Sequence, residues 1–127
     1  MHMKTIINTP HAPTAIGTYS QAVRVDNTVY ISGQIPLDPK TMQMVNGNFS
    51  KHVAQVFENL KAVAIAAHSD LSHIVKLTVY VRDLEQFGVI NEIMATYFQA
   101  PYPARAVVEV SRLPKDAVIE MDAVLIV

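Results

Sequence analysis

The strongest constraint on the fold is an alternating strand pattern that lies between two helix patterns in the middle of the chain. Apolar residues recur at steps of three and four over Phe49–Ala67, which predicts an amphipathic helix. Apolar and polar residues then alternate over Ile74–Arg82, which predicts a strand with one strongly apolar face. That face is expected to consist of Val75, Leu77, Val79 and Val81. Asp83 and Gln86 have capping-box spacing, and a second helix is expected from there to about Phe98.

Further segments have the composition of strands and are separated by loops rich in proline, glycine and polar residues. They are Lys4–Ile7, Tyr19–Val25, Thr28–Ile31, Arg105–Ser111 and Ala117–Val127. The predicted order is therefore β-β-β-α-β-α-β-β. Two amphipathic helices among several strands predict an α+β fold, with one sheet and both helices packed on a single face.

The second face of this sheet needs a cover of its own. Tyr30, Val79 or Val81, Val107 and Val124 are too apolar to leave that whole face in water. Only 17% of the residues are charged, against about 25% in an average protein, which also suggests that partner subunits cover part of the surface. We therefore expect an oligomer that associates through the open face of the sheet.

Length and composition exclude several classes of protein. A chain of 127 residues is expected to form one domain, spanning residues 1–127. The net charge of -1 and the pI near 6.5 argue against a nucleic-acid partner. No apolar run approaches the roughly 18 residues of a membrane span, and no signal-peptide core is present. A soluble protein of the cytoplasm is the expectation.

The same residues argue against metal, cofactor and nucleophile chemistry. The chain has no cysteine, so disulfides and thiolate nucleophiles are excluded. No two of its five histidines have the spacing of a helical metal site, and we expect no bound metal. The sequence has neither a glycine-rich phosphate-binding fingerprint nor a Gly-x-Ser-x-Gly nucleophile turn, and we expect no cofactor.

Polar residues that interrupt apolar patterns are the candidates for a functional site. Asn91 lies on or beside the apolar stripe of the second predicted helix, where it either bonds nearby backbone at the rim or holds a loop or ligand. Glu120 and Asp122 share a strand face with apolar neighbours. If the last two strands pair as a hairpin, Arg105 may share that face with them, although sequence does not fix the register. The cluster is then either a solvated edge with weak ion pairs or a site where Arg105 binds a small carboxylate.

Tyr19, Ser32 and Gly33 lie where predicted strands meet loops, which is a common position for residues that line pockets. Each of them alone is weak support for a site.

Together these residues resemble the RidA/YjgF family of reactive-intermediate imine deaminases, and the resemblance runs over nearly the whole chain. It is carried by three blocks, which are residues 16–22 (IGTYSQA), residues 31–36 (ISGQIP) and the C-terminal series PARA at 103–106, LP at 113–114 and IEM at 119–121. The resemblance implies a chorismate-mutase-like fold and a homotrimer with pockets between subunits. It also implies hydrolysis of 2-imino acids, or their enamine tautomers, to 2-keto acids and ammonia. These substrates are released by pyridoxal-phosphate enzymes such as threonine dehydratase.

The family pattern also implies a role for each candidate residue. Arg105 matches the arginine that grips the substrate carboxylate, and Glu120 matches the acidic residue that positions water. Tyr19, Ser32 and Asn91 match pocket residues, and Gly33 matches a backbone contact near the reacting group.

Two positions depart from the family pattern. Thr18 stands where many relatives have proline, and Val107 stands where many have cysteine. A thiol therefore cannot be essential in this chain, and any hydrogen bond that it would give to the attacking water is missing. Glu120 would have to contribute more to positioning that water.

Two other functions stay open at this stage. The same residues would serve a trimer that binds 2-keto acids without turning them over and regulates a partner. Ribonuclease or translation-inhibitor activity, which some relatives show, is disfavoured by the charge balance and by the lack of a suitable histidine pair.

Overall fold

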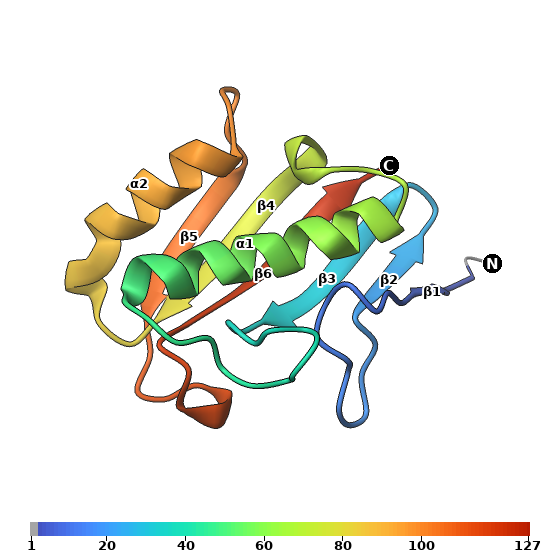
Figure 1. Ribbon diagram of the computed structural model, residues 1–127. Coiled ribbons are helices and arrows are strands. Elements are labelled where there is room, and N and C mark those ends of the chain that lie inside the picture. Colours follow the sequence, from blue (N-terminus) through green and yellow to red (C-terminus); the bar gives the residue numbers. More distant parts are fainter. Residues whose placement is uncertain (1–2) are drawn as a thin grey trace.

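The computed structural model describes residues 3–127, so that Met1 and His2 of the expected domain lie outside the described residues. Six strands and two α-helices make up the fold (Figure 1). Their bounds are β1 Thr5–Ile7, β2 Ala22–Val25, β3 Thr28–Gln34, α1 Phe49–Ala66, β4 Ile74–Val81, α2 Phe87–Tyr97, β5 Ala104–Glu109 and β6 Ile119–Ile126. Three short 3₁₀ segments, Leu71–His73, Leu84–Gln86 and Pro114–Asp116, connect these elements. The predicted order of helices and strands is confirmed.

All six strands form one mixed sheet in the order β1-β2-β3-β6-β4-β5. Neighbouring strands are antiparallel except β4 and β5, which are parallel. The hairpin of the last two strands that was considered from the sequence does not form, because β6 inserts between β3 and β4 while β5 pairs with the far edge of β4. The parallel pairing is possible because α2 forms the crossover between β4 and β5.

Both helices cover the same face of the sheet, as predicted (Figure 1). Asn48 begins α1 by accepting a hydrogen bond from the backbone N–H of Lys51, and the chain leaves the helix through His68, whose φ of 62° is left-handed. The core lies between α1 and the strands, where Phe57, Leu60 and Leu77 are fully buried. No helix among residues 3–127 is long and apolar enough to cross a membrane.

The open face of the sheet is more polar than predicted. Val79 and Val81 lie on the helix face and are fully buried, and Val107 also packs against the core beneath the helices. The open face does carry Tyr30, paired across strands with Val124, and Tyr30 is 53% exposed. Ile126 lies two residues after Val124 in β6, so it points to the same face, where it is 40% exposed.

One strand residue lies on the opposite face from the one predicted. Val75 was expected on the apolar face of β4, yet it is exposed because the register of β4 against β6 shifts between Ile74 and Lys76. Such an irregularity reverses the alternation for the residues that precede it.

Two of the strand ends that differ from the sequence prediction concern candidate site residues. β2 begins at Ala22, so Tyr19 belongs to the preceding loop. β3 continues to Gln34, so Ser32 and Gly33 lie inside the strand, at a shift in its register against β6 between Ile31 and Gln34.

Candidate functional site

Arg105 lies on the helix face of β5, where its neighbour in β4 is the buried Leu77. Its guanidinium meets three side chains of α2. Nη1 donates hydrogen bonds to Asn91 Oδ1 at 2.7 Å and to Met94 Sδ at 3.5 Å. The guanidinium carbon also lies 5.1 Å from the centre of the Phe87 ring, within the range of a cation–π contact. Arg105 is thus held from one side by a single helix.

A cavity of about 490 Å³ opens beside this guanidinium. Its lining consists of Asn91, Met94, Ala95, Tyr102, Pro103 and Arg105. Within residues 3–127, Nε and Nη2 of Arg105 make no hydrogen bond, so these two donors are available to a ligand. Two parallel N–H donors on a permanently charged group are suited to a planar carboxylate.

Glu120 lies in a second cavity, of about 480 Å³, beside the end of β3 and the start of β6. Its lining includes Tyr19, Ser32, Gly33, Pro114, Lys115 and Glu120. The Glu120 carboxylate lies directly over Gly33. A Cβ atom built on Gly33 would come 2.9 Å from Cδ of Glu120, closer than real side chains approach. Glycine at this position therefore makes room for the carboxylate.

The environment of Glu120 favours its neutral form. Burial, and after it the negative charge of Asp122, raises the pKa of Glu120 above its ordinary value of 4.5. Asp122 itself accepts a hydrogen bond of 2.9 Å from the Tyr80 hydroxyl, and this bond raises the pKa of Tyr80. A carboxyl group with a raised pKa is a better proton acceptor once it is ionised.

Tyr19 and Ser32 hold the loop that borders this cavity. The Ser32 hydroxyl donates to the carbonyl oxygen of Ser20 at 2.6 Å, and the Tyr19 hydroxyl accepts from the N–H of Ile16 at 3.3 Å. Tyr19 is nevertheless 53% exposed, so one side of its ring is free to contact another molecule.

Arg105 and Glu120 do not share a face of the sheet, which contradicts the arrangement considered from the sequence. Arg105 is paired with Leu77 across β4 and β5, and the buried Leu77 points toward the helices, so Arg105 lies on the helix face. Glu120 pairs with Tyr80 and lies on the open face, while its neighbours Ile119 and Met121 are buried beneath the helices. The chain therefore carries two half-sites, an Arg105 half-site on the helix side and a Glu120 half-site on the open side.

The sequence reasoning missed several residues of these half-sites. Phe87 and Met94 fit the apolar pattern of the second predicted helix and were not named as site candidates, although their spacing from Asn91 places all three on one face of a helix. Met94 is a buried core residue whose sulfur also contacts Arg105. Lys115 lines the Glu120 cavity and Tyr102 lines the Arg105 cavity, and neither was named as a candidate from the sequence.

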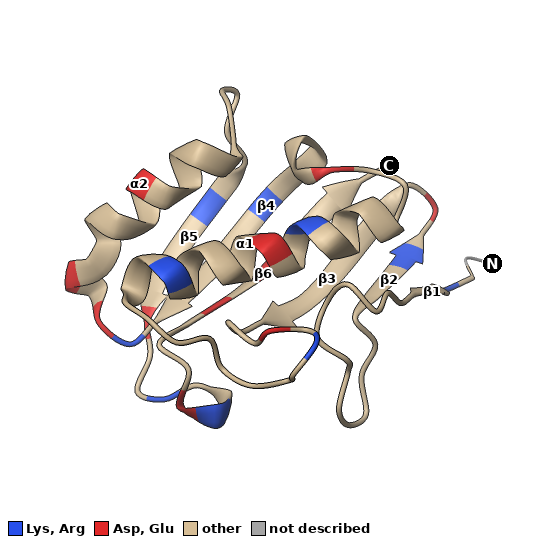
Figure 2. Cartoon of the chain, viewed as in Figure 1, with Lys and Arg blue, Asp and Glu red and all other residues tan. Residues whose placement is uncertain are grey.

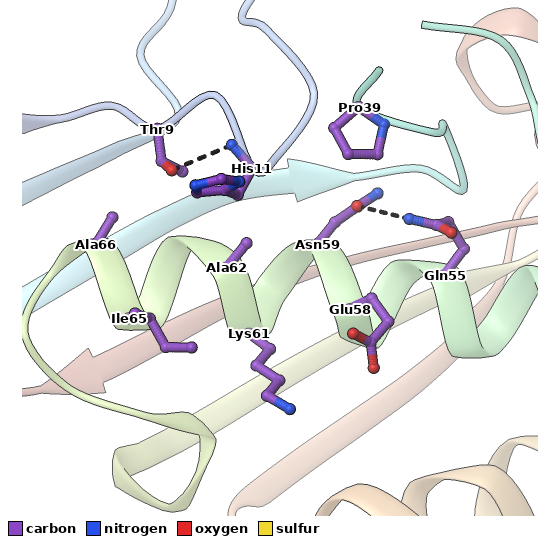
Figure 3. Close-up of a pocket in the computed structure, with 10 residues that line it drawn as sticks. All are labelled: Thr9, His11, Pro39, Gln55, Glu58, Asn59, Lys61, Ala62, Ile65 and Ala66. Atoms are coloured by element: carbon purple, nitrogen blue, oxygen red, sulfur yellow. Dashed lines mark hydrogen bonds between the residues drawn. The ribbon is translucent and has the colours of Figure 1, made fainter. Parts of the chain in front are cut away.

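A third cavity, of about 520 Å³, lies between α1 and the loops that carry Thr9, His11 and Pro39 (Figure 3). Two pairs of its lining residues are hydrogen-bonded to each other. Gln55 Nε2 donates to Asn59 Oδ1 at 2.9 Å, and the N–H of His11 donates to the Thr9 hydroxyl at 3.2 Å (Figure 3). None of the predicted site residues lines this cavity.

Charged residues of both signs occur on the fold. Figure 2 shows Lys and Arg on α1, β2, β4 and β5, and Asp and Glu on both helices and in the loops. Over the described range 3–127, no group of three or more His, Asp or Glu side chains is arranged to hold a metal ion.

Comparison with known proteins points to one family. Residues 9–127 match the family model described as Endoribonuclease L-PSP. The chain is 44% identical to the 2-iminobutanoate/2-iminopropanoate deaminase of Dermatophagoides farinae, over 100% of this chain and 99% of that protein. The crystal structure of RidA from the Antarctic bacterium Psychrobacter sp. PAMC 21119 superposes with a TM-score of 0.94 at 49% identity, covering 97% of this chain and 99% of that one.

A third relative was solved with a small molecule bound. The crystal structure of E. coli TdcF with bound serine has a TM-score of 0.90 and is 39% identical, covering 97% of this chain and 98% of that one. These matches extend over the whole fold, including both half-sites, and they agree with the resemblance that the three sequence blocks carry. The chain therefore belongs to the RidA/YjgF/L-PSP family.

Proposed function

We propose that this protein hydrolyses 2-imino acids and their enamine tautomers to 2-keto acids and ammonia. The observation that carries the proposal is the Arg105 guanidinium, which is anchored through Nη1 and has Nε and Nη2 free beside a cavity of about 490 Å³. Such a group binds the carboxylate that every 2-imino acid carries. Relatives named 2-iminobutanoate/2-iminopropanoate deaminase, at 44–45% identity, support the choice of substrate.

We further propose that the complete site forms between subunits of a homotrimer. Arg105 of one copy and Glu120 of the next would face the same ligand, because within one chain they lie on opposite faces of the sheet. The exposed Tyr30 and Ile126 on the open face supply apolar area for such an interface. Tyr19, Ser32 and Gly33 would then border the ligand from the Glu120 side.

In this site the reaction needs a positioned water and a proton acceptor. The imine nitrogen takes up a proton from solvent, and water adds to the carbon of the C=N bond while one of its protons passes to the Glu120 carboxylate. As the C–N bond of the resulting carbinolamine breaks, Glu120 gives its proton to the leaving nitrogen, which departs as ammonia. The C=O bond forms and the hydroxyl proton returns to solvent. The net change is imine plus water to ketone plus ammonia. Arg105 contributes by holding the carboxylate so that the water and the reacting carbon are aligned.

A non-catalytic role in binding small carboxylates is the second candidate. It is favoured by the serine-bound TdcF structure, since serine carries a carboxylate of the same kind. An endoribonuclease activity, which the family description names, is not proposed here because the charges are mixed and the net charge is -1.

A coupled assay separates turnover from binding alone. Threonine dehydratase generates 2-iminobutanoate from threonine, and release of 2-ketobutyrate is followed with and without this protein. We expect faster release with the wild-type protein and no acceleration with Arg105→Ala. Binding of 2-ketobutyrate without any acceleration would support the non-catalytic role instead.

The oligomeric state tests the proposal that the site lies between subunits. Sedimentation equilibrium at micromolar concentration should give three times the chain mass of 14.0 kDa. A stable interface of ordinary size buries about 1,600 Å², which is enough to keep the trimer intact at that concentration. A mass of 14.0 kDa would contradict both the trimer and the shared site.

A further inference from the structure

We propose that Phe87 is a positioning residue that sets the direction of the Arg105 guanidinium by cation–π contact. The proposal deepens the proposed function and rests on it, since Arg105 is taken as the carboxylate-binding group. Phe87 is the first residue of α2, it is 39% exposed, and its ring lies beside the Arg105 guanidinium.

Three contacts from one face of α2 fix two features of the guanidinium, one of its ends and one of its faces. Asn91 Oδ1 accepts from Nη1 at 2.7 Å, and Met94 Sδ accepts a weaker bond from the same nitrogen at 3.5 Å. Both contacts fix one end of the group but leave it free to rotate about that end. The Phe87 ring, with its centre 5.1 Å from the guanidinium carbon, gives the planar cation a preferred face to rest on.

This arrangement determines which edge of Arg105 a ligand meets. With Nη1 occupied by Asn91 and one face directed at Phe87, the remaining edge is the one formed by Nε and Nη2. The N–H bonds on that edge are parallel and match the two oxygens of a carboxylate. Without the aromatic face, Arg105 keeps its charge and its bond to Asn91 but loses the constraint on its plane.

Phe87 acts on Arg105 and not by lining the ligand cavity. Of the described residues, six line that cavity, and Phe87 lies outside the set. Its effect on a ligand should therefore not depend on the ligand's side chain. A residue that contacts the ligand's apolar end would instead discriminate between pyruvate and 2-ketobutyrate, which differ by one methylene.

The test compares Phe87→Leu, Phe87→Tyr and Leu84→Ala in the full-length protein. Leucine keeps apolar bulk but has no π face, and tyrosine keeps the face. Leu84 is an exposed apolar residue near the same helix end, at 43%, and serves as the matched control. Affinity for pyruvate and for 2-ketobutyrate is measured by calorimetry, and KM and kcat are measured in the coupled assay.

We expect Phe87→Leu to weaken both ligands equally, by about 3- to 5-fold, and to raise KM by a similar factor with kcat within about twofold. Phe87→Tyr should restore wild-type affinity, and Leu84→Ala should not change it. The ¹⁵N and ¹H shifts of Arg105 Nε should move in Phe87→Leu and return in Phe87→Tyr, a signal that a purely structural role would not produce.

Unchanged affinity in Phe87→Leu would overturn the proposal. So would an unequal loss for the two keto acids, which would make Phe87 a ligand contact, or an equal loss in Phe87→Tyr, which would make it a packing residue. These outcomes are read from binding and from the Arg105 shifts, so they stand even if the coupled assay shows no turnover. Absence of binding by the wild-type protein would overturn the carboxylate site itself.

Discussion

Arg105 and Glu120 are held in place by opposite means. Three side chains of α2 surround one end and one face of the Arg105 guanidinium, so its position depends on groups that are present. The position of Glu120 depends on a group that is missing, because its carboxylate occupies the space that a side chain on Gly33 would fill. A substitution that removes a contacting side chain should therefore disturb the Arg105 half-site, whereas a substitution that adds a side chain at Gly33 should disturb the Glu120 half-site.

The two half-sites also differ in whether their charged group can change its protonation state. Arginine stays charged at any depth in a protein, so the helix only has to orient it. Glu120 is partly buried beside Asp122, and both features raise its pKa. The Arg105 half-site is thus suited to binding, and the Glu120 half-site is suited to exchanging a proton. Substitutions at Arg105, Glu120, Gly33 and Asp122 test this division of roles, from the largest expected effect to the smallest.

Arg105→Ala should cause the largest loss, a fall in kcat/KM on the order of 10³-fold, because two charge-assisted hydrogen bonds to the carboxylate disappear. Arg105→Lys keeps the charge but has no parallel N–H pair, so we expect a loss nearly as large. Steady-state kinetics in the coupled assay measure both variants. Full activity in Arg105→Lys would show that charge alone is needed and that the orientation by α2 is irrelevant.

Glu120→Gln should lower kcat by about 10²-fold and leave ligand affinity nearly intact, because the amide cannot accept the proton of the attacking water. Burial and the charge of Asp122, which raise the pKa of Glu120, make its charged form less favourable in the folded protein than in the unfolded chain. Between its ordinary and its raised pKa the folded state binds more protons, so stability falls as pH rises through that window. Above the window, Glu120→Gln should therefore raise Tm.

Two other outcomes would assign Glu120 differently. If it only orients water, Glu120→Gln should lose little and Glu120→Ala more. If it pairs with Arg105 or a neighbouring chain for stability, both variants should lower Tm and disturb the trimer, with activity falling in proportion. An intact trimer with unchanged kcat in Glu120→Ala would refute the role in catalysis.

Gly33→Ala adds one methyl group where Glu120 lies and should displace its carboxylate. The new Cβ would stand 2.9 Å from Cδ of Glu120, so one of the two must move. Because misplacing a catalytic group by about 1 Å is costly, we expect kcat to fall on the order of 10-fold while ligand affinity changes less. Kinetics and calorimetry on the same preparation separate the two effects.

Gly88→Ala is the matched control for this substitution. A Cβ on Gly88 meets nothing within 4 Å, and the residue lies in α2, beside the other half-site. Alanine should stabilise the helix by about 0.5–1 kcal/mol and leave kcat unchanged. Equal losses in both variants would mean that close packing at Gly33 is not what places Glu120.

The first helix could be predicted from the sequence almost to the residue, because its pattern is local, whereas α2 begins only at Phe87, after the 3₁₀ segment Leu84–Gln86 that Asp83 caps. Periodic apolar residues predicted Phe49–Ala67 and the structure has Phe49–Ala66. The candidate site residues were also named from the sequence, through the blocks that resemble the family, and the structure places them around two cavities. Their mutual arrangement could not be predicted, because it depends on which strands pair.

The pairing of β6 decides the arrangement of the site. Its insertion between β3 and β4 brings Glu120 over Gly33, which is 87 positions earlier in the chain. The same pairing leaves β5 parallel to β4, and this register turns Arg105 toward α2. A hairpin of the last two strands satisfied the local pattern equally well, since alternation fixes which residues share a face only within one strand.

The smallest expected effect concerns the pH dependence of the Glu120 half-site. As a general base Glu120 works only when ionised, so kcat should fall as pH drops through its raised pKa. Asp122→Asn removes the nearby charge but keeps an oxygen that can accept from the Tyr80 hydroxyl, so the sheet should be little disturbed. The pKa of Glu120 should then decrease, and the acid limb of the pH–kcat profile should move to lower pH. The limb should persist because burial, the larger cause, remains, whereas Glu120→Gln should abolish it. A limb that stays in place in Asp122→Asn would mean that another group governs the rate.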